Sequence, residues 1–111
     1  MISKNLTAAT TKPLILGILR QGNCYGYLII KKIKEMSGGT MAWSDGMVYP
    51  VLHRLEKEGF IQSNWEMAEN GRPRKYYQIT EAGKLELQAE REQWNTIHSL
   101  LDQLWEVKPS H

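Results

Sequence analysis

The side chains with the clearest chemical potential lie in the stretch Ser44–Phe60, and their types suit contact with nucleic acid. If this stretch is a helix, its outer face carries Tyr49, His53, Arg54 and Lys57. Arginine and lysine donate hydrogen bonds to phosphates and to base edges, so such a face fits a nucleic-acid groove. Charged outer faces are also common on solvated helices, and this pattern alone is therefore a weak indication.

Catalytic chemistry is not indicated by the reactive side chains. His53, His98 and His111 are isolated from one another, and Cys24 has no evident base beside it. No pair of His, Cys or carboxylate residues has the spacing of a metal site. We therefore expect no metal and no cofactor, and an enzyme is the least favoured class.

A recognition helix over Ser44–Phe60 would position the candidate contact residues. Its apolar residues recur at three- and four-residue steps, which places them on one inward face: Val48, Val51, Leu52 and Leu55. Ser44 can cap the start, and Gly59 stands where a C-terminal cap belongs. Pro50 lacks a backbone N–H and its ring falls against the Gly46 carbonyl, so we expect a bend there rather than a break.

Two helices and a short strand are predicted before this helix. The first helix begins with Thr11 as its cap and Pro13 in its opening turn, where proline is tolerated, and ends at Gly22. The second opens at Tyr25–Tyr27 and ends at residues 37–39. Their inward faces would be formed by Leu14, Ile15, Ile18 and Leu19, and by Leu28, Ile29, Ile33 and Met36. Large apolar residues alternate in the connection 40–43, which predicts a strand.

A β-hairpin is predicted after the recognition helix. Side chains alternate in character along 61–65 and again along 75–79, and Asn70-Gly71 between them is a strong turn signal. Three cations are expected at the tip: Arg72, Arg74 and Lys75. For an isolated hairpin, a merely soluble loop would be the simpler interpretation. Because this hairpin follows a candidate recognition helix, we interpret it as a basic wing.

A long C-terminal helix is predicted from Thr80, its cap, to about Glu106. Its apolar seam, interrupted by Glu90, consists of Leu87, Trp94, Ile97, Leu101 and Leu104. At about 1.5 Å per residue the helix would be roughly 40 Å long, more than a small domain can cover. We therefore expect the surplus apolar face to be buried against a second copy across a two-fold axis.

Composition fits one compact unit that gains from pairing. A chain of 111 residues builds a modest core, so a second copy would add useful burial. The absence of a bilayer-spanning run or an evident leader, together with a single cysteine, leads us to expect a cytoplasmic protein. Residues 1–79 contain 11 Lys or Arg against 6 Asp or Glu, whereas residues 80–111 contain 3 against 6. The basic part suits phosphate.

These elements together predict a mainly α fold with a small β-hairpin (α+β). The order of three helices, a basic hairpin and a long last helix is that of a winged helix-turn-helix with an added dimerisation arm. We place the DNA-binding domain at residues 1–79, and the C-terminal dimerisation helix with a short tail at residues 80–111. The two parts are expected to form one compact unit.

Three segments resemble the PadR family of bacterial transcriptional regulators. They are Tyr25–Tyr27, Val48–Ile61 and Gly71–Gly83, in the family's order. The resemblance covers the chain from about Lys12 to Leu104. With only one helix after the wing, the chain is similar to the compact subfamily that includes multidrug-sensing repressors of the LmrR type.

The resemblance implies a homodimeric repressor of a near-palindromic operator in double-stranded DNA, with one recognition helix of each subunit in successive major grooves. By position, Tyr49 is expected to meet DNA, with Pro50, His53 and Arg54 near it. Arg54 could pair with guanine, and Lys57 more plausibly reaches phosphate.

The wing residues Arg72, Arg74 and Lys75 are expected to meet phosphates or the minor groove. One departure from the family is Met47, since members commonly have a hydroxyl residue two positions before the tyrosine. We therefore expect either a missing phosphate contact or an altered base preference at this position.

Trp94 has two interpretations. It is either a core aromatic of the dimer seam or, with its symmetry mate, a wall of a slot at the dimer centre that stacks on a flat, apolar compound, with or without a positive charge. Compact relatives bind drugs in such a place, and Ile15, Leu19 and Ile97 would be nearby lining. A ligand there would act by changing the angle between the two arms.

Two other functions stay open. The first is a winged-helix adaptor that binds another protein, because the same fold serves DNA binding and protein binding. Binding by such an adaptor would not depend on the wing cations. A carrier that sequesters aromatic compounds would bind its ligand without any dependence on DNA.

Overall fold

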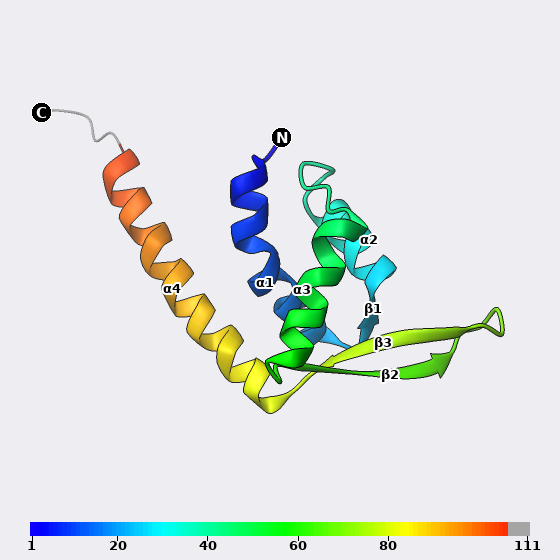
Figure 1. Cartoon of the computed structure of the whole chain (residues 1–111). Helices are drawn as coiled ribbons and strands as arrows, with labels where there is room; N and C mark the ends of the chain where they lie inside the picture. Colours follow the sequence, from blue (N-terminus) through cyan, green and yellow to red (C-terminus); the bar gives the residue numbers. More distant parts are fainter. Residues whose placement is uncertain (107–111) are drawn as a thin grey trace, which may run out of the picture.

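The computed structural model describes residues 1–106, which form helices and a three-stranded antiparallel sheet of order β1-β3-β2. The elements are α1 (Lys4–Gln21), β1 (Cys24–Tyr25), α2 (Gly26–Met36), α3 (Asp45–Lys57), β2 (Ile61–Met67), β3 (Pro73–Ile79) and α4 (Glu81–Trp105). Figure 1 shows α4 and the β2–β3 hairpin leaving the body on opposite sides. The predicted fold class is confirmed. The tail at residues 107–111, including His111, lies outside the described residues.

The first helix starts earlier than predicted. α1 begins at Lys4, where the Ser3 side chain accepts a backbone N–H hydrogen bond at 3.3 Å. Thr11 therefore lies inside the helix rather than at its cap, and its hydroxyl donates to the Thr7 carbonyl at 2.7 Å. A threonine satisfied in this way is compatible with a helix interior. Pro13 also lies inside the helix, not in its opening turn.

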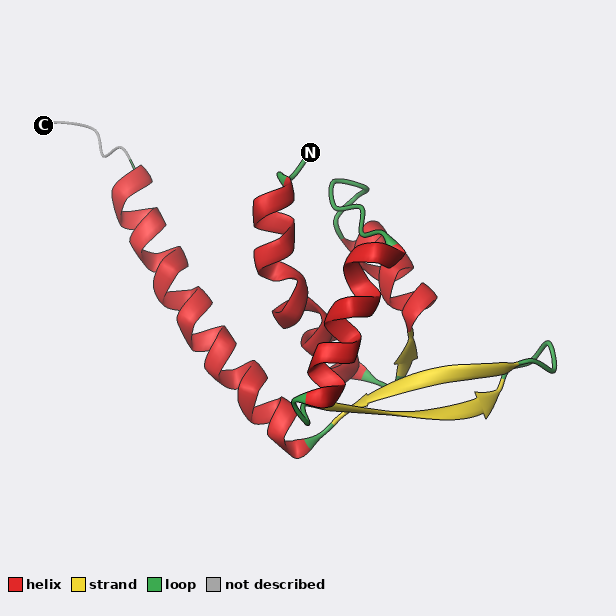
Figure 2. Ribbon diagram, viewed as in Figure 1, coloured by secondary structure: helices red, strands yellow, loops and turns green. Residues whose placement is uncertain are grey.

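A strand predicted at residues 40–43 is absent there, and the strand that pairs with the hairpin is β1 at Cys24–Tyr25. β1 pairs antiparallel with β3, so the chain adds a strand just before α2 instead of just before α3 (Figure 2). Residues 40–43 form a loop in which Met41 and Trp43 are buried. The alternation in this loop therefore marked burial correctly. It did not mark a strand, because a strand also needs a partner that offers backbone hydrogen bonds.

One hydrophobic core lies between α1, α2, α3 and the sheet. Its fully buried side chains include Ile15, Leu16, Ile29, Val48, Leu52, Leu55, Ile61 and Tyr77. The predicted inward faces of the first three helices are confirmed except for Met36, whose side chain at the end of α2 is 68% exposed. The core thus holds α3 by its apolar face and leaves the opposite face free.

The end of α3 is closed as predicted. Gly59 adopts φ +84°, its N–H donates to the Glu56 carbonyl at 3.1 Å, and the Phe60 N–H donates to the Leu55 carbonyl at 3.0 Å. This pair of bonds ends a helix through a left-handed residue, a conformation that glycine adopts without steric cost. The chain then enters β2 directly, so the wing follows α3 with little freedom between them.

α4 is anchored at its first turn. The Thr80 hydroxyl accepts a hydrogen bond from the Gly83 N–H at 3.0 Å and donates to the Gly59 carbonyl at 2.7 Å. Gly83 packs so closely on the Phe60 carbonyl that a Cβ there would overlap it. Beyond this turn α4 runs beside α1, with its 25 residues spanning roughly 37 Å.

Candidate nucleic-acid interface

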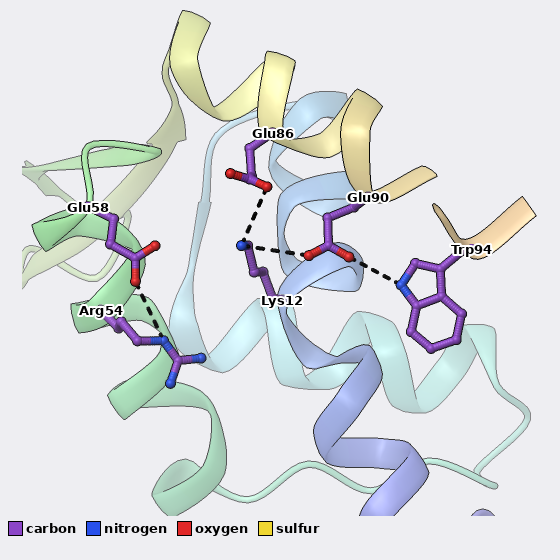
Figure 3. A network of polar contacts seen from close by, with 6 residues as sticks. All are labelled: Lys12, Arg54, Glu58, Glu86, Glu90 and Trp94. Atoms are coloured by element: carbon purple, nitrogen blue, oxygen red, sulfur yellow. Dashed lines mark hydrogen bonds and ion pairs between the residues drawn. The ribbon is translucent and has the colours of Figure 1, made fainter. Parts of the chain in front are cut away.

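The outer face of α3 presents most of the predicted contact residues to solvent. Pro50, His53, Arg54 and Lys57 are all exposed, and Pro50 does not interrupt the helix. The Arg54 guanidinium lies 3.9 Å from the Glu58 carboxylate (Figure 3). An exposed pair of this kind contributes little stability, so Arg54 can exchange its partner at small cost.

Tyr49 does not face out as predicted but lies half-buried against the start of α2. A Cβ on Gly26 would fall 2.5 Å from the Tyr49 hydroxyl oxygen, so the phenol rests on the glycine backbone. Only glycine leaves this space. The packing holds the Tyr49 ring at the junction of α2, α3 and the wing. The ring therefore lies at the edge of the exposed face of α3 and does not project from it.

The three wing cations do not gather at the tip as predicted. β2 and β3 each extend two residues further than expected, which leaves Arg72 alone in the turn. Lys75 faces α3, with Nζ 3.7 Å from the Glu56 carboxylate. Arg74 points to the opposite face of the strand, since neighbours in a strand alternate, and its guanidinium lies 4.0 Å from the centre of the Tyr25 ring.

The turn itself has the predicted chemistry. Gly71 adopts φ +79°, and the Asn70 side-chain oxygen accepts a hydrogen bond from the Arg72 N–H at 3.1 Å. The Arg72 carbonyl also accepts from the Ala68 N–H at 2.9 Å. The backbone of Arg72 is therefore held from both sides while its side chain remains exposed. This places the exposed Arg72 side chain at the far end of the wing.

Glu56 ties the wing to α3. Its carboxylate accepts a hydrogen bond from the Ser63 hydroxyl of β2 and forms the ion pair with Lys75 of β3. Burial raises the pKa of the neighbouring Tyr77 phenol, and the charge of Glu56 adds to the shift. The phenol therefore stays neutral under ordinary conditions. Together these contacts set the angle between α3 and the hairpin.

A groove of about 400 Å³ joins the start of α2, the outer side of α3 and the wing. It brings together four predicted residues, namely Tyr49 and His53 from α3 and Arg74 and Lys75 from β3. The other predicted residues lie outside its lining: Pro50, Arg54, Lys57 and Arg72. Among the described residues that line the groove, none carries a carboxylate. The phosphates of a nucleic-acid strand would therefore meet the cations Arg74 and Lys75 in this lining and no negative charge.

Two further lining residues were missed by sequence reasoning. Tyr27 of α2 and Trp65 of β2 border the groove, and each is 67% exposed. The alternation over residues 61–65 predicts that Trp65 lies on the same buried face as Ile61. It does not show that the hairpin leaves the body of the protein after Ser63, which leaves Trp65 exposed. The available signal was the position itself, since a tryptophan near the end of a projecting hairpin has no core to enter.

A second cavity, of about 750 Å³, lies between α1 and α4. Trp94 lines it, as predicted for a ligand site, but its predicted companions do not. Ile15 and Leu19 are turned into the core, and Ile97 lies outside the lining. Successive residues of a helix point about 100° apart, so Pro13 and Leu14 line the cavity while Ile15 and Leu19 point into the core. Its described cationic lining residues are Arg20, Lys84 and Arg91.

A chain of polar contacts orients Trp94 beside this cavity (Figure 3). The indole Nε1–H donates to the Glu90 carboxylate at 3.2 Å, and the other oxygen of that carboxylate lies 3.6 Å from Lys12 Nζ. Lys12 in turn lies 3.6 Å from Glu86. Glu90, expected only to interrupt the seam, thus satisfies the one donor of the indole and fixes the ring against α1.

The apolar seam of α4 is covered only in part within one chain. Leu87 packs on the core, and Trp94 and Leu101 are half-buried. Ile97 and Leu104 are 46% and 79% exposed, and Leu100 and Trp105 beside them are 52% and 72% exposed. A run of exposed apolar side chains of this kind is typical of an interaction surface.

Metal binding and membrane insertion find no support among residues 1–106. This part of the chain has no group of three or more His, Cys, Asp or Glu side chains that could hold a metal. None of its helices is both long and apolar enough to cross a bilayer. Cys24 is buried and free, and burial raises the pKa of its thiol, so it is protonated and unreactive at neutral pH.

Known proteins similar to this chain include transcriptional regulators. The family described as "Transcriptional regulator PadR-like family" matches residues 15–89. The "Negative transcriptional regulator PadR" of Bacillus subtilis is 37% identical over 73 residues, which cover 66% of this chain and 40% of that protein. The chain thus matches less than half the length of that relative.

Solved structures extend the similarity to nearly the whole chain. A transcriptional regulator from Clostridium thermocellum superposes with a TM-score of 0.86 at 27% identity, covering 96% of this chain and 100% of that one. A PadR family transcription regulator from Clostridium difficile gives a TM-score of 0.77 at 30% identity, covering 87% and 99%.

Proposed function

The chain belongs to the PadR-like family of transcriptional regulators, and from this premise we propose that it is a homodimeric repressor of a near-palindromic operator, released by a flat, apolar or aromatic ligand. Regulators of this family bind DNA and are not enzymes. In this proposal residues 1–79 bind DNA and residues 80–111 dimerise, in the cytoplasm, where a bacterial promoter lies.

The observation that carries DNA binding is the arrangement of α3 and the wing around one groove without carboxylates. Pro50, His53 and Arg54 stand on the exposed face that would enter the major groove, where Arg54 would exchange its exposed partner Glu58 for guanine. Lys57, near the end of the helix, would reach phosphate. Arg72, alone at the tip of the wing, would meet phosphate or the flanking minor groove.

Arg74 and Lys75 have a different role in this proposal. Each is already engaged within the protein, Arg74 with the Tyr25 ring and Lys75 with Glu56. They add positive charge to the wall of the groove while holding the wing in place. Replacing Arg74 and Lys75 by alanine should therefore weaken the attraction for DNA and also disturb the position of the wing. Replacing Arg72 should weaken the attraction alone.

The exposed seam of α4 supports the homodimer. Leu87, Trp94, Ile97, Leu101 and Leu104 recur at helical steps along one side, and burial within the chain ends before the helix does. A second copy related by a two-fold axis would cover the remainder, because such an interface presents the same patch from both subunits. The same axis would present two recognition helices to successive major grooves.

The cavity between α1 and α4 supports a ligand stacked on Trp94. The lining is mostly apolar, with the cations Arg20, Lys84 and Arg91. These charges favour a neutral or anionic ring over a cationic one. A compound there would shift the equilibrium between two arm angles only if its affinity differs between them, and release from DNA follows if the looser-binding angle is favoured.

The test is fluorescence anisotropy with labelled DNA from the region upstream of the protein's own gene, against scrambled DNA, at several salt concentrations. The wild type is compared with Arg72→Ala/Arg74→Ala/Lys75→Ala. As a control, Lys84→Ala/Arg91→Ala removes two cations of α4 that lie outside the lining of the groove. We expect tighter binding to the upstream DNA, and weaker, less salt-dependent binding by the wing variant. If neither DNA binds, or the wing variant behaves as wild type, an adaptor for another protein replaces the repressor.

A further inference from the structure

The groove between α3 and the wing holds two large aromatic side chains that the contacts proposed above leave unused. Trp65 stands on β2 and Tyr27 in the first turn of α2, and each is 67% exposed. Exposed indole and phenol rings keep a large apolar area in water, which is unfavourable unless a partner covers them. The β2–β3 hairpin projects on the side opposite α4 (Figure 1), so a dimer formed through α4 would leave this hairpin, which carries Trp65, uncovered.

We propose that Trp65 and Tyr27 hold the sugar–phosphate backbone of one DNA strand, the strand that separates the major groove entered by α3 from the minor groove beside the wing. This inference rests on the proposed DNA binding and assigns to it two residues from elements other than the recognition helix. Its ligand is a phosphodiester strand in duplex form, recognised by shape and charge rather than by base sequence.

The register of the wing places Trp65 on the correct side. Trp65 pairs with Lys75 across the ribbon, and paired residues share a face of a sheet. Lys75 reaches Glu56 of α3, and so does Ser63, two residues before Trp65 on the same strand face. The indole therefore lies on the face of the wing that is turned toward α3. The wing and α3 form opposite walls of one groove.

The geometry of a duplex supplies the occupant. Adjacent major and minor grooves are separated by a single sugar–phosphate strand. A protein that puts a helix into one groove and a hairpin beside the next must straddle that strand. The groove between α3 and the wing is the part of this molecule that lies between the two, and its lining has the cations Arg74 and Lys75 but no carboxylate among the described residues.

The side-chain chemistry matches a backbone rather than a base. A deoxyribose ring presents an apolar face that a flat indole can cover, and the indole N–H and the Tyr27 hydroxyl are donors for phosphate oxygens. Contacts of this kind carry no sequence information, so both residues should act equally on any duplex. They should also leave the salt dependence of binding unchanged, because neither carries a charge.

The experiment measures anisotropy on upstream and scrambled DNA for Trp65→Thr, Trp65→Phe and Tyr27→Phe. Threonine keeps the strand propensity of the position, and phenylalanine keeps a flat ring. Met36→Ala serves as the matched control, since Met36 is 68% exposed on α2 but outside the groove lining. His53→Ala serves as the comparison for a base contact.

We expect Trp65→Thr to weaken binding to both DNAs about tenfold, with the ratio of the two affinities and the salt slope unchanged. Trp65→Phe should retain most of the affinity, Tyr27→Phe should lose about threefold on both DNAs, and Met36→Ala should match wild type. In contrast, His53→Ala should lower the affinity ratio. The change in tryptophan emission when wild type binds DNA should disappear in Trp65→Phe, a readout that does not depend on how well the threonine variant folds.

Two results overturn the inference while leaving the repressor intact. One is wild-type affinity in Trp65→Thr together with an emission change that persists in Trp65→Phe. The other is a loss confined to upstream DNA, which would make Trp65 a base contact. If the wild type binds neither DNA, the proposed function itself fails and takes the inference with it.

Discussion

Replacing Arg72 by alanine removes a wing cation that, unlike Arg74 and Lys75, pairs with no other side chain of residues 1–106. Its backbone is held by Asn70 and Ala68 while its side chain is exposed, so the change should leave the turn intact. Each phosphate neutralised contributes about 0.9 to the slope of log affinity against log salt. A dimer carries two wings, and the slope should therefore become shallower by about 1.8.

This change of slope has a measurable size. Between 50 and 200 mM salt, a fourfold range, the ratio of the DNA affinity of the wild type to that of Arg72→Ala should fall by about 12-fold. Anisotropy titrations on upstream and scrambled DNA measure it, and the loss should be the same for both, since phosphates carry no sequence. Arg91→Ala removes an exposed arginine from α4 as the matched control and should leave the slope unchanged.

Two outcomes would refute the reasoning. An unchanged slope would mean that Arg72 neutralises no phosphate. A loss restricted to upstream DNA would mean that Arg72 reads base edges in the minor groove instead.

Three further changes test other contacts. Gly26→Ala drives a methyl into Tyr49 and should cost about 1–3 kcal/mol of stability in the wild type, but clearly less when it is made in a Tyr49→Ala background, as thermal unfolding of the four proteins would measure. Gly83→Ala meets the Phe60 carbonyl, and a loss of about 2 kcal/mol would lower Tm by about 9 °C for 111 residues. Leu104→Asp, at a side chain 79% exposed in one chain, should yield monomers in sedimentation velocity without lowering helix content.

Matched changes sharpen these three results. Gly17 lies within α1 with nothing within 4 Å of an added Cβ, so Gly17→Ala should raise Tm where Gly83→Ala lowers it. Leu85 is 70% exposed on α4 but outside the seam, and Leu85→Asp should leave the dimer intact. Equal effects of Leu85→Asp and Leu104→Asp would contradict the seam. An equal cost of Gly26→Ala with and without Tyr49→Ala would contradict the packing between those two residues.

The helix faces could be predicted because burial imposes a period on the sequence. Val48, Leu52 and Leu55 recur at the helical step and are all fully buried. Gly59 and Asn70-Gly71 could be interpreted because their positions require left-handed or turn geometry that few residues adopt. These local rules were sufficient to place α3, the hairpin and the start of α4.

The errors arose where the outcome depends on a distant partner. β1 exists because the edge of β3 accepts it, and nothing near residue 24 indicates that edge. The ribbon extends past the predicted strands because a hairpin in solvent buries neither face, so no apolar alternation marks its outer half. Tyr49 was expected to face out, but the space above Gly26 depends on how α2 packs on α3.

The most direct measurement for a dimeric, sequence-specific DNA-binding protein is selection of binding sites from a random double-stranded library, which does not presuppose the operator. We predict that the wild-type chain enriches a near-palindrome whose half-sites lie about 10 base pairs apart, one turn of the duplex. We also predict that Arg54→Ala enriches the same spacing with a relaxed base at one position of each half-site. Recovery of unrelated sequences with no shared motif, at salt concentrations where the protein still binds, would contradict specific recognition by this chain.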